Sequence, residues 1–201
     1  MHPARKRARF RILSLYPHPR YIGHVVLDEE GLVPDAAFSC RTRRFPTLDE
    51  KIASLEERFA TSIKQYEPTV IVVVRATGCD SLEAMMNRAI ALADATRLPV
   101  RIRYEAAITS LFVDERLEAY DKLGQSVTKT FFPELARGGT AWGRGHRDDK
   151  LRHHRPTWKA AAGAVAVLAE MRPRAVRRLA RGPMPSGLRT ELDRALHPPA
   201  L

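Results

Sequence analysis

The chain has 201 residues, of which 44% are hydrophobic, a formal net charge of +11 and an isoelectric point near 10.2. This length buries one good core, and no run approaches the roughly 18 apolar residues that would span a membrane. Such basicity is typical of proteins that bind a polyanion, most often nucleic acid, although a GC-rich genome that places arginine on any surface gives the same composition. Cys40 and Cys79 form no metal or disulfide pattern and the N-terminus lacks the apolar segment of a secretory signal, so we expect a cytoplasmic protein.

Three strands are predicted after a basic N-terminal arm, residues 1–9. Residues 10–16 and 21–28 are rich in Ile, Val, Leu and Tyr and are separated by a Pro-containing turn, which is typical of antiparallel strands. Residues 32–42 form a weaker third strand, because Pro34 restricts it to an edge or to a strand start.

The pattern then alternates between helix and strand. Apolar residues three or four apart predict a helix over 48–66 with a Thr47–Glu50 capping box, and a second over 80–96 with an Asp80–Glu83 box. Between them, residues 70–74 are five consecutive β-branched residues, which predicts a strand buried on both faces. Residues 98–104 follow as an edge strand with one basic face.

The rest of the chain gives weaker signals. We expect short helices at 106–113 and 114–124, the second capped by Asp114, a linker at 124–129 and a mobile basic loop at 138–155. Pro156 is well placed to begin a last helix that ends near residue 171. Residues 173–201 are rich in Arg and Pro, and we expect them to dock as short helices or to stay disordered.

This element order predicts a ribonuclease H-like α/β fold, a mixed sheet of three antiparallel strands followed by parallel strands with helices on both faces. The domain comprises residues 10–172, preceded by the arm and followed by the tail. Four segments resemble the RuvC-type Holliday-junction resolvases: "ILSLYPHPRYIG", "IKQYEPTVIVVV", "AMMNRAIALADATRLPVRIRY" and "AAAGAVAVLAEM".

The resemblance implies a two-metal nuclease site, but the carboxylates of that site are missing. Mg²⁺ requires oxygen ligands in near-octahedral order, and two metals stabilise the attacking and leaving oxygens of the phosphate. The acid of the first strand falls on Tyr16, and that of the central strand on Val74, or on Arg75 in a register shifted by one. The closing pair falls on Trp158 and Ala161, or on Arg155 and Trp158. Arg75 and Lys159 put positive side chains where metal cations would lie.

We therefore expect a degenerate pocket with no catalytic residue, no bound metal and no cofactor, in which Tyr16 fills the former metal site. The alternative for Tyr16 is an ordinary strand aromatic packed beside the last helix. Other metal-ligand types cluster in the predicted loop, where solvated charges are commoner than a preformed site. They are Asp148, Asp149, His153 and His154.

Three functions stay open. The first is a catalytically degenerate RuvC-like protein that binds structured DNA or RNA as a subunit or accessory factor. The second is an active Mg²⁺-dependent endodeoxyribonuclease, a junction resolvase whose acids have moved, for instance to Asp28, Glu105, Asp114, Asp148 or Asp149. The third is a protein-interaction scaffold. The resemblance implies a homodimer or larger nucleoprotein complex, for which the helix over 81–95 offers an apolar stripe that burial against its own sheet explains equally well.

If the chain binds nucleic acid, its clustered basic residues are the expected phosphate contacts. Trp142 stacks on a base or covers the core. The basic residues are Arg5, Lys6, Arg7, Arg9, Arg41, Arg43, Arg44, Arg144, Arg147, Arg152, Arg172, Arg174, Arg177 and Arg178.

Overall fold

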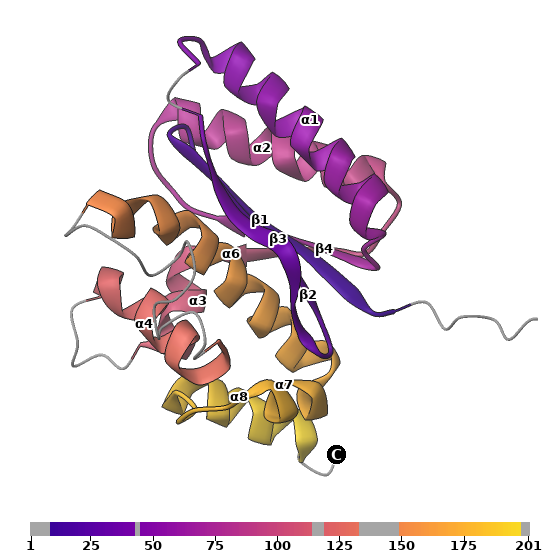
Figure 1. The fold of residues 1–201 in the computed structure, drawn as a ribbon, viewed down its shortest axis with the longest axis vertical. Helices are drawn as coiled ribbons and strands as arrows, with labels where there is room; N and C mark the ends of the chain where they lie inside the picture. Colours follow the sequence, from indigo (N-terminus) through magenta and orange to yellow (C-terminus); the bar gives the residue numbers. More distant parts are fainter. Residues whose placement is uncertain (1–8, 43–44, 114–118, 133–148, 198–201) are drawn as a thin grey trace, which may run out of the picture.

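A five-stranded mixed sheet is the centre of the computed structural model, which describes residues 9–42, 45–113, 119–132 and 149–197 (Figure 1). The strand order is β3-β2-β1-β4-β5, with β1 antiparallel to β2 and parallel to β4. This arrangement confirms the predicted ribonuclease H-like sheet. The strands are β1 Arg11–Pro17, β2 Tyr21–Asp28, β3 Gly31–Arg41, β4 Val70–Arg75 and β5 Val100–Tyr104.

The parallel strands β1, β4 and β5 all end at the same side of the sheet. Leu15 is in register with Val73, and Arg75 with Tyr104. We call this side the carboxyl edge, and ligand sites of α/β sheets commonly form there. Val70 to Val74 are at most 1% exposed, as their uninterrupted β-branched run predicts, and β4 is an interior strand beside the middle strand β1.

Helices α1 (Leu48–Tyr66) and α2 (Asp80–Ala95) cover one face of the sheet. The Thr47 side chain accepts from the Glu50 N–H and the Glu50 carboxylate accepts from the Thr47 N–H, so the first predicted capping box is confirmed. The second is wrong, because Asp80 is already helical and Cys79 is the N-cap without a side-chain hydrogen bond. The apolar stripe of α2 packs on its own sheet.

Helices α3 (Glu105–Phe112), α4 (Ala119–Phe131) and α6 (Asp149–Met171) cover the opposite face. Two glycines let α6 approach the sheet closely. A Cβ atom on Gly163 would lie 2.4 Å from Val74 Cγ2, and one on Gly23 in β2 would lie 2.0 Å from the carbonyl oxygen of Pro156. The small residues expected in this helix therefore bring its backbone against β2 and β4.

Two boundaries differ from the prediction. Residues 124–129 belong to α4, not to a linker, because Leu123, Val127 and Phe131 recur every four residues and are all buried. Gly124 is accommodated there because its missing Cβ leaves room for the Trp158 ring. Helix α6 begins before Pro156, so residues 149–155, described as backbone only, are helical and not part of a loop. Proline at a first turn is favourable, but it does not prevent a helix from continuing upstream at the cost of one hydrogen bond.

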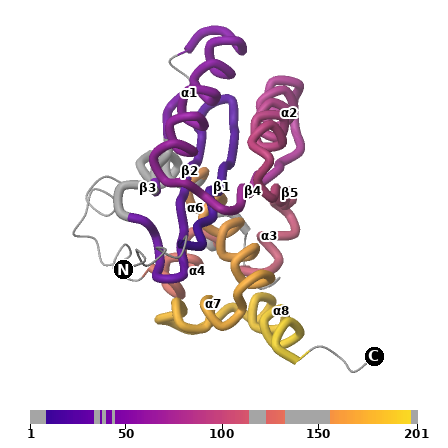
Figure 2. The backbone as a smooth tube through the Cα atoms, turned by 90° about the vertical axis from the view of Figure 1, so that its right-hand side faces the viewer, coloured from indigo at the N-terminus to yellow at the C-terminus, as the bar shows by residue number. Residues whose placement is uncertain are grey.

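Helices α7 (Pro173–Leu179) and α8 (Ser186–Leu196) fold onto the same core, at the end of the molecule away from α1 (Figure 2). Val176, Leu188 and Leu192 are at most 1% exposed. The N–H groups of Arg181 and Gly182 both donate to the carbonyl of Thr130, which joins this segment to the end of α4. The hydrophobic core therefore continues past residue 172.

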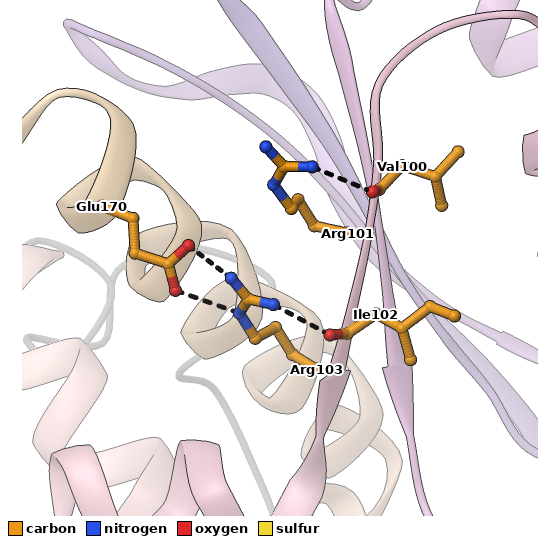
Figure 3. Close-up of polar contacts among 5 residues, drawn as sticks. All are labelled: Val100, Arg101, Ile102, Arg103 and Glu170. Atoms are coloured by element: carbon orange, nitrogen blue, oxygen red, sulfur yellow. Dashed lines mark hydrogen bonds and ion pairs between the residues drawn. The ribbon is translucent and has the colours of Figure 1, made fainter.

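Both edge strands are protected against pairing. β3 carries Pro34 and shows a register shift opposite Val25 and Leu27. On β5, the guanidinium groups of Arg101 and Arg103 donate to the carbonyls of Val100 and Ile102 on their own strand, at 3.4 and 3.0 Å (Figure 3). Charged side chains of this kind discourage edge-to-edge association. No helix in the described part of the chain is long and apolar enough to cross a membrane.

Candidate functional site: an ion-paired pocket at the carboxyl edge

Three side chains from different elements meet at the carboxyl edge. Tyr16 lies near the end of β1, Glu105 is the first residue of α3 directly after β5, and Lys159 projects from α6. Helix α6 carries Lys159 over Tyr16, and four residues later Gly163 lies over Ser14 of the same strand. The i, i+4 spacing on the helix thus matches the i, i+2 spacing on one face of the strand.

The three polar groups form a closed set of contacts. The Tyr16 hydroxyl donates to Glu105 Oε2 at 2.9 Å, and Lys159 Nζ donates to the Tyr16 hydroxyl at 3.1 Å. Lys159 Nζ lies 2.5 Å from Glu105 Oε1 and 4.6 Å from the centroid of the Tyr16 ring. The exposed fractions are 3% for Tyr16 and 15% and 18% for the side chains of Lys159 and Glu105.

The pocket therefore contains its own cation. The Glu105 carboxylate neutralises the Lys159 ammonium, and the hydroxyl and the face of the Tyr16 ring supply the electron-rich groups that an ammonium prefers. Ser14 Oγ, on the same face of β1, is fully buried and has no hydrogen-bond partner among the described residues. Burial at this level makes each contact worth more than an exposed ion pair, whose contribution is typically below about 1 kcal/mol.

His18 lies beside Tyr16, in surroundings that favour its neutral form. Its ring stacks beside that of Tyr16, with centroids 6.1 Å apart, and its Nδ1 accepts from the N–H of Arg20 at 3.1 Å. This contact places the imidazole proton on Nε2. Burial lowers the pKa of His18 below its usual 6.5, and the charges of Lys159 and Arg20 lower it further, against an opposing effect of Glu105.

The residues predicted to form the degenerate pocket do not all meet. Val74 is fully buried and packs against α6 at Gly163, and Ala161 is 1% exposed on that helix. Trp158 contacts α4 at Gly124. Arg75 is on the opposite face, where its guanidinium bonds Glu83 of α2 at 2.8 Å. Arg155 lies in the α6 segment whose side chains are not described.

The candidate relocated acids are also dispersed. Among the candidates whose side chains are described, Glu105 alone reaches the pocket, and its carboxylate is paired with Lys159. Asp28 lies at the opposite end of the sheet, where it accepts from the N–H groups of Glu30 and Gly31. Asp149, His153 and His154 are on the α6 backbone, while Asp114 and Asp148 lie outside the described residues. Within the described ranges no three His, Cys, Asp or Glu residues could hold a metal ion together.

These residues do not fit a divalent metal. A two-metal site needs several carboxylate oxygens, whereas this pocket offers one carboxylate that already holds an ammonium group. A second cation would meet the positive charge of Lys159 at close range.

The basic residues proposed as phosphate contacts separate into two groups where the structure describes them. Arg41, at the end of β3, pairs in register with Tyr21 at the carboxyl edge. Arg172 and Arg178 lie at the opposite end, 3.5 and 3.7 Å from Glu29. Arg9 is exposed just before β1, and Arg174 and Arg177 are on α7, the latter paired with Asp193. The side chain of Arg152 is not described, and the remainder lie outside the described residues: Arg5, Lys6, Arg7, Arg43, Arg44, Trp142, Arg144 and Arg147.

Three residues at the carboxyl edge were not among the predicted site residues. They are His18, Arg20 and Tyr104, of which Tyr104 is 55% exposed. Their positions in the sequence could have identified them, because residues at the carboxyl ends of parallel strands commonly form ligand sites. His18 and Arg20 lie in the turn directly after β1, and Tyr104 is the last residue of β5. Lys159 is expected from the sequence only as a cation near the former metal site, and it directly follows Trp158, one of the expected pocket residues.

The fold is similar to that of solved RuvC structures. The structure of RuvC from Thermus thermophilus matches with a TM-score of 0.56 at 14% sequence identity, over 88% of this chain and 99% of that one. T. thermophilus RuvC in complex with a Holliday junction substrate matches with a TM-score of 0.54 at 13% identity, over 81% of this chain and 96% of the other. No protein-family profile and no curated protein matches the sequence. The chain thus has the RuvC-like form of the ribonuclease H fold.

Proposed function

We propose that this chain, which has the RuvC-like fold, is a catalytically degenerate nucleic-acid-binding protein that acts as a subunit or accessory factor on structured DNA or RNA. The observation that carries the proposal is the Lys159 ammonium group, held between the Tyr16 hydroxyl and the Glu105 carboxylate at the carboxyl edge. An internal ammonium there replaces the charge of a metal ion but offers neither open coordination positions nor an activated water.

The binding half of the proposal rests on charge and on the shape of the fold. A net charge of +11 on 201 residues favours a polyanionic partner. A similar fold has been solved with a Holliday junction substrate. Arg20 and Arg41 are exposed at the carboxyl edge, and His18 presents an N–H donor beside them. We infer that a phosphate backbone crosses this edge and contacts these groups.

The test is a salt titration of binding, with a fluorescently labelled four-way junction, duplex and single strand as separate probes. Each phosphate neutralised on duplex DNA adds about 0.9 to the slope of log affinity against log salt, so about six contacts cost roughly a thousandfold between 50 and 200 mM. The combined variant Arg20→Ala/Arg41→Ala should bind more weakly and with a shallower slope, at an unchanged melting temperature.

A matched control removes two arginines at the α7 end of the molecule, Arg177 beside Asp193 and Arg178 beside Glu29, in the variant Arg177→Ala/Arg178→Ala. We expect it to lose less affinity than the carboxyl-edge variant. If the control loses more, the binding face lies at the α7 end and the proposed face is wrong. If the wild-type chain shows no measurable affinity for any probe at 50 mM salt, the scaffold function replaces the nucleic-acid proposal.

The active endonuclease is the second candidate, and the presence of Glu105 in the pocket is the observation that favours it. That function requires Lys159 to release Glu105 when Mg²⁺ binds. Junction cleavage that depends on Mg²⁺ and disappears in Glu105→Gln would support it over the degenerate protein.

A further inference from the structure

A groove on the helical side of the molecule has the properties of an anion site. It lies between the end of α3, the second half of α4 and the segment that joins α7 to α8, and its volume is about 570 Å³. A smaller cavity along α1 has a volume of about 170 Å³. Ligand pockets commonly span about 300 to 1,000 Å³, so the groove, unlike the α1 cavity, accepts a molecule of nucleotide size.

The groove is basic and contains no carboxylate among its lining residues. Lys129 enters it from the last turn of α4 and Arg189 from α8. The Arg189 guanidinium donates to the carbonyl of Met184 at 3.3 Å, which holds it beside the groove. Within the described part of the chain no carboxylate contacts either cation. Both charges are therefore available to an anionic group.

The polar and apolar parts of the lining suit a ligand with two different ends. Ser126 contributes a hydroxyl group from α4, on the same side as Lys129. Val113 and Met184, which are both half-buried, provide an apolar surface. Thr130 does not compete for a ligand, because its hydroxyl donates to the carbonyl of Pro183 at 2.8 Å. Cations and a hydroxyl group suit a phosphate, and the apolar surface suits a planar ring.

A second groove has a similar volume but differs in its charge. It lies between α3, α6 and α8 and has a volume of about 530 Å³. Its two arginines are already paired, Arg103 with Glu170 and Arg194 with Glu191. Figure 3 shows the guanidinium of Arg103 directed at both carboxylate oxygens of Glu170. Of these two grooves, the one at Lys129 and Arg189 combines this volume with positive charge that no described carboxylate neutralises.

We propose that the groove at Lys129 and Arg189 binds a nucleoside phosphate, with the phosphate on the two cations and the base against Val113 and Met184. The source of this group is a free mononucleotide or one nucleotide of a single strand. The inference does not depend on the proposed function, because the groove is built from helices α3, α4 and α8 and includes no residue of the carboxyl edge.

The experiment measures equilibrium binding of two fluorescent probes to the full chain, a labelled mononucleotide and a labelled six-nucleotide single strand. The variants Lys129→Ala and Arg189→Ala should each lose about tenfold in affinity, as expected for a charged hydrogen bond. Arg194→Ala is the matched control for Arg189, since it removes the same charge from the same helix outside the groove. Lys64→Ala in the last turn of α1 is the control for Lys129.

The outcomes separate this site from the nucleic-acid face at the carboxyl edge. Mononucleotide binding that Lys129→Ala and Arg189→Ala weaken and the controls do not supports a free-nucleotide site, even if no junction or duplex is bound. The same pattern with the single strand alone supports a strand-binding site. Failure of both probes to bind, or equal losses in the variants and controls, overturns the proposal. Ser126→Trp fills the groove without changing a charge, and retained binding in that variant would also overturn it.

Discussion

The ammonium group of Lys159 lies 2.5 Å from Glu105 Oε1 and 3.1 Å from the Tyr16 hydroxyl, although these residues come from α6, α3 and β1. The contact links the last long helix to the carboxyl edge of the sheet and leaves both charges largely shielded from water. Because each of the two charges is shielded from water and neutralised by the other, removing either residue leaves an unpaired charge in the pocket. A cation covalently attached to the fold is also present at any metal concentration.

The ion pair should be measurable as a contribution to stability. We expect Lys159→Met to lower the free energy of unfolding by about 1 to 3 kcal/mol, because it leaves the Glu105 carboxylate shielded from water without a cation. The double variant Lys159→Met/Glu105→Gln should recover part of the loss, and urea denaturation measures both. Arg194→Met, which breaks the exposed pair with Glu191, is the control and should change little. A loss in Lys159→Met no larger than in this control would show that the pair is energetically unimportant.

The pH dependence of stability should carry a contribution from His18. Its pKa in the folded state is lowered from 6.5, so the unfolded chain binds more protons at mildly acidic pH. The stabilisation from neutral His18 is therefore complete above about pH 6.5 and is lost as the pH falls from there through the folded-state pKa. His18→Gln should show a shallower fall in stability over this range.

The same residue offers a direct check by NMR. The His18 ring should titrate below pH 6.5 in the wild-type chain, and Lys159→Met should move its midpoint upward because one of the two neighbouring positive charges is removed. A His18 midpoint at or above 6.5 in the wild type would contradict the pocket's electrostatics.

Gly163→Ala should destabilise the protein, although alanine is the better helix former by up to about 1 kcal/mol. The added Cβ would lie 2.4 Å from Val74 Cγ2, so α6 must move away from the sheet, at a cost of about 1 to 3 kcal/mol. Combining it with Val74→Ala removes the clashing methyl, and the double variant should be less destabilised than the sum of the two single variants. Additive effects would mean that the close approach at Gly163 does not determine the packing.

Helices α7 and α8 should be part of the cooperative fold. Leu188 is fully buried on α8, so Leu188→Ala should cost about 2 to 5 kcal/mol and lower the midpoint of a single unfolding transition. Arg174→Ala, which changes an exposed residue of α7, should stay within about 0.5 kcal/mol of the wild type. An early separate transition in Leu188→Ala, with the main transition unmoved, would show that this segment folds independently.

The sequence predicts the elements that depend on local pattern better than those that depend on contacts. The run from Val70 to Val74 and the Thr47–Glu50 box identify β4 and the start of α1, since each signal is complete within a few residues. The boundary of α4 is the exception, because Gly124 indicates a linker while the Leu123, Val127 and Phe131 repeat continues the helix through it. Gly124 is explained only by the Trp158 ring beside it.

The sequence predicts where the pocket lies but not which side chains form it. Tyr16 was placed where the resemblance implies a carboxylate, and the structure puts it at the carboxyl edge. Its partners are 89 and 143 residues away along the chain, so no local pattern pairs them. Glu105 was one of five candidate acids, and Lys159 lies next to a position that the resemblance marked. Only the crossing of α6 over β1 brings the three side chains together.

The measurement that tests the central claim most directly is the binding of an end-labelled four-way DNA junction at 50 mM salt, in Mg²⁺ and in EDTA, followed by analysis of the strands on a denaturing gel. Because Lys159 supplies the positive charge of the pocket, we predict measurable affinity in EDTA, no gain in affinity that requires Mg²⁺, and intact strands in both conditions. Binding that requires Mg²⁺, or strands cut only in its presence, would contradict the account and identify the chain as a metal-dependent resolvase.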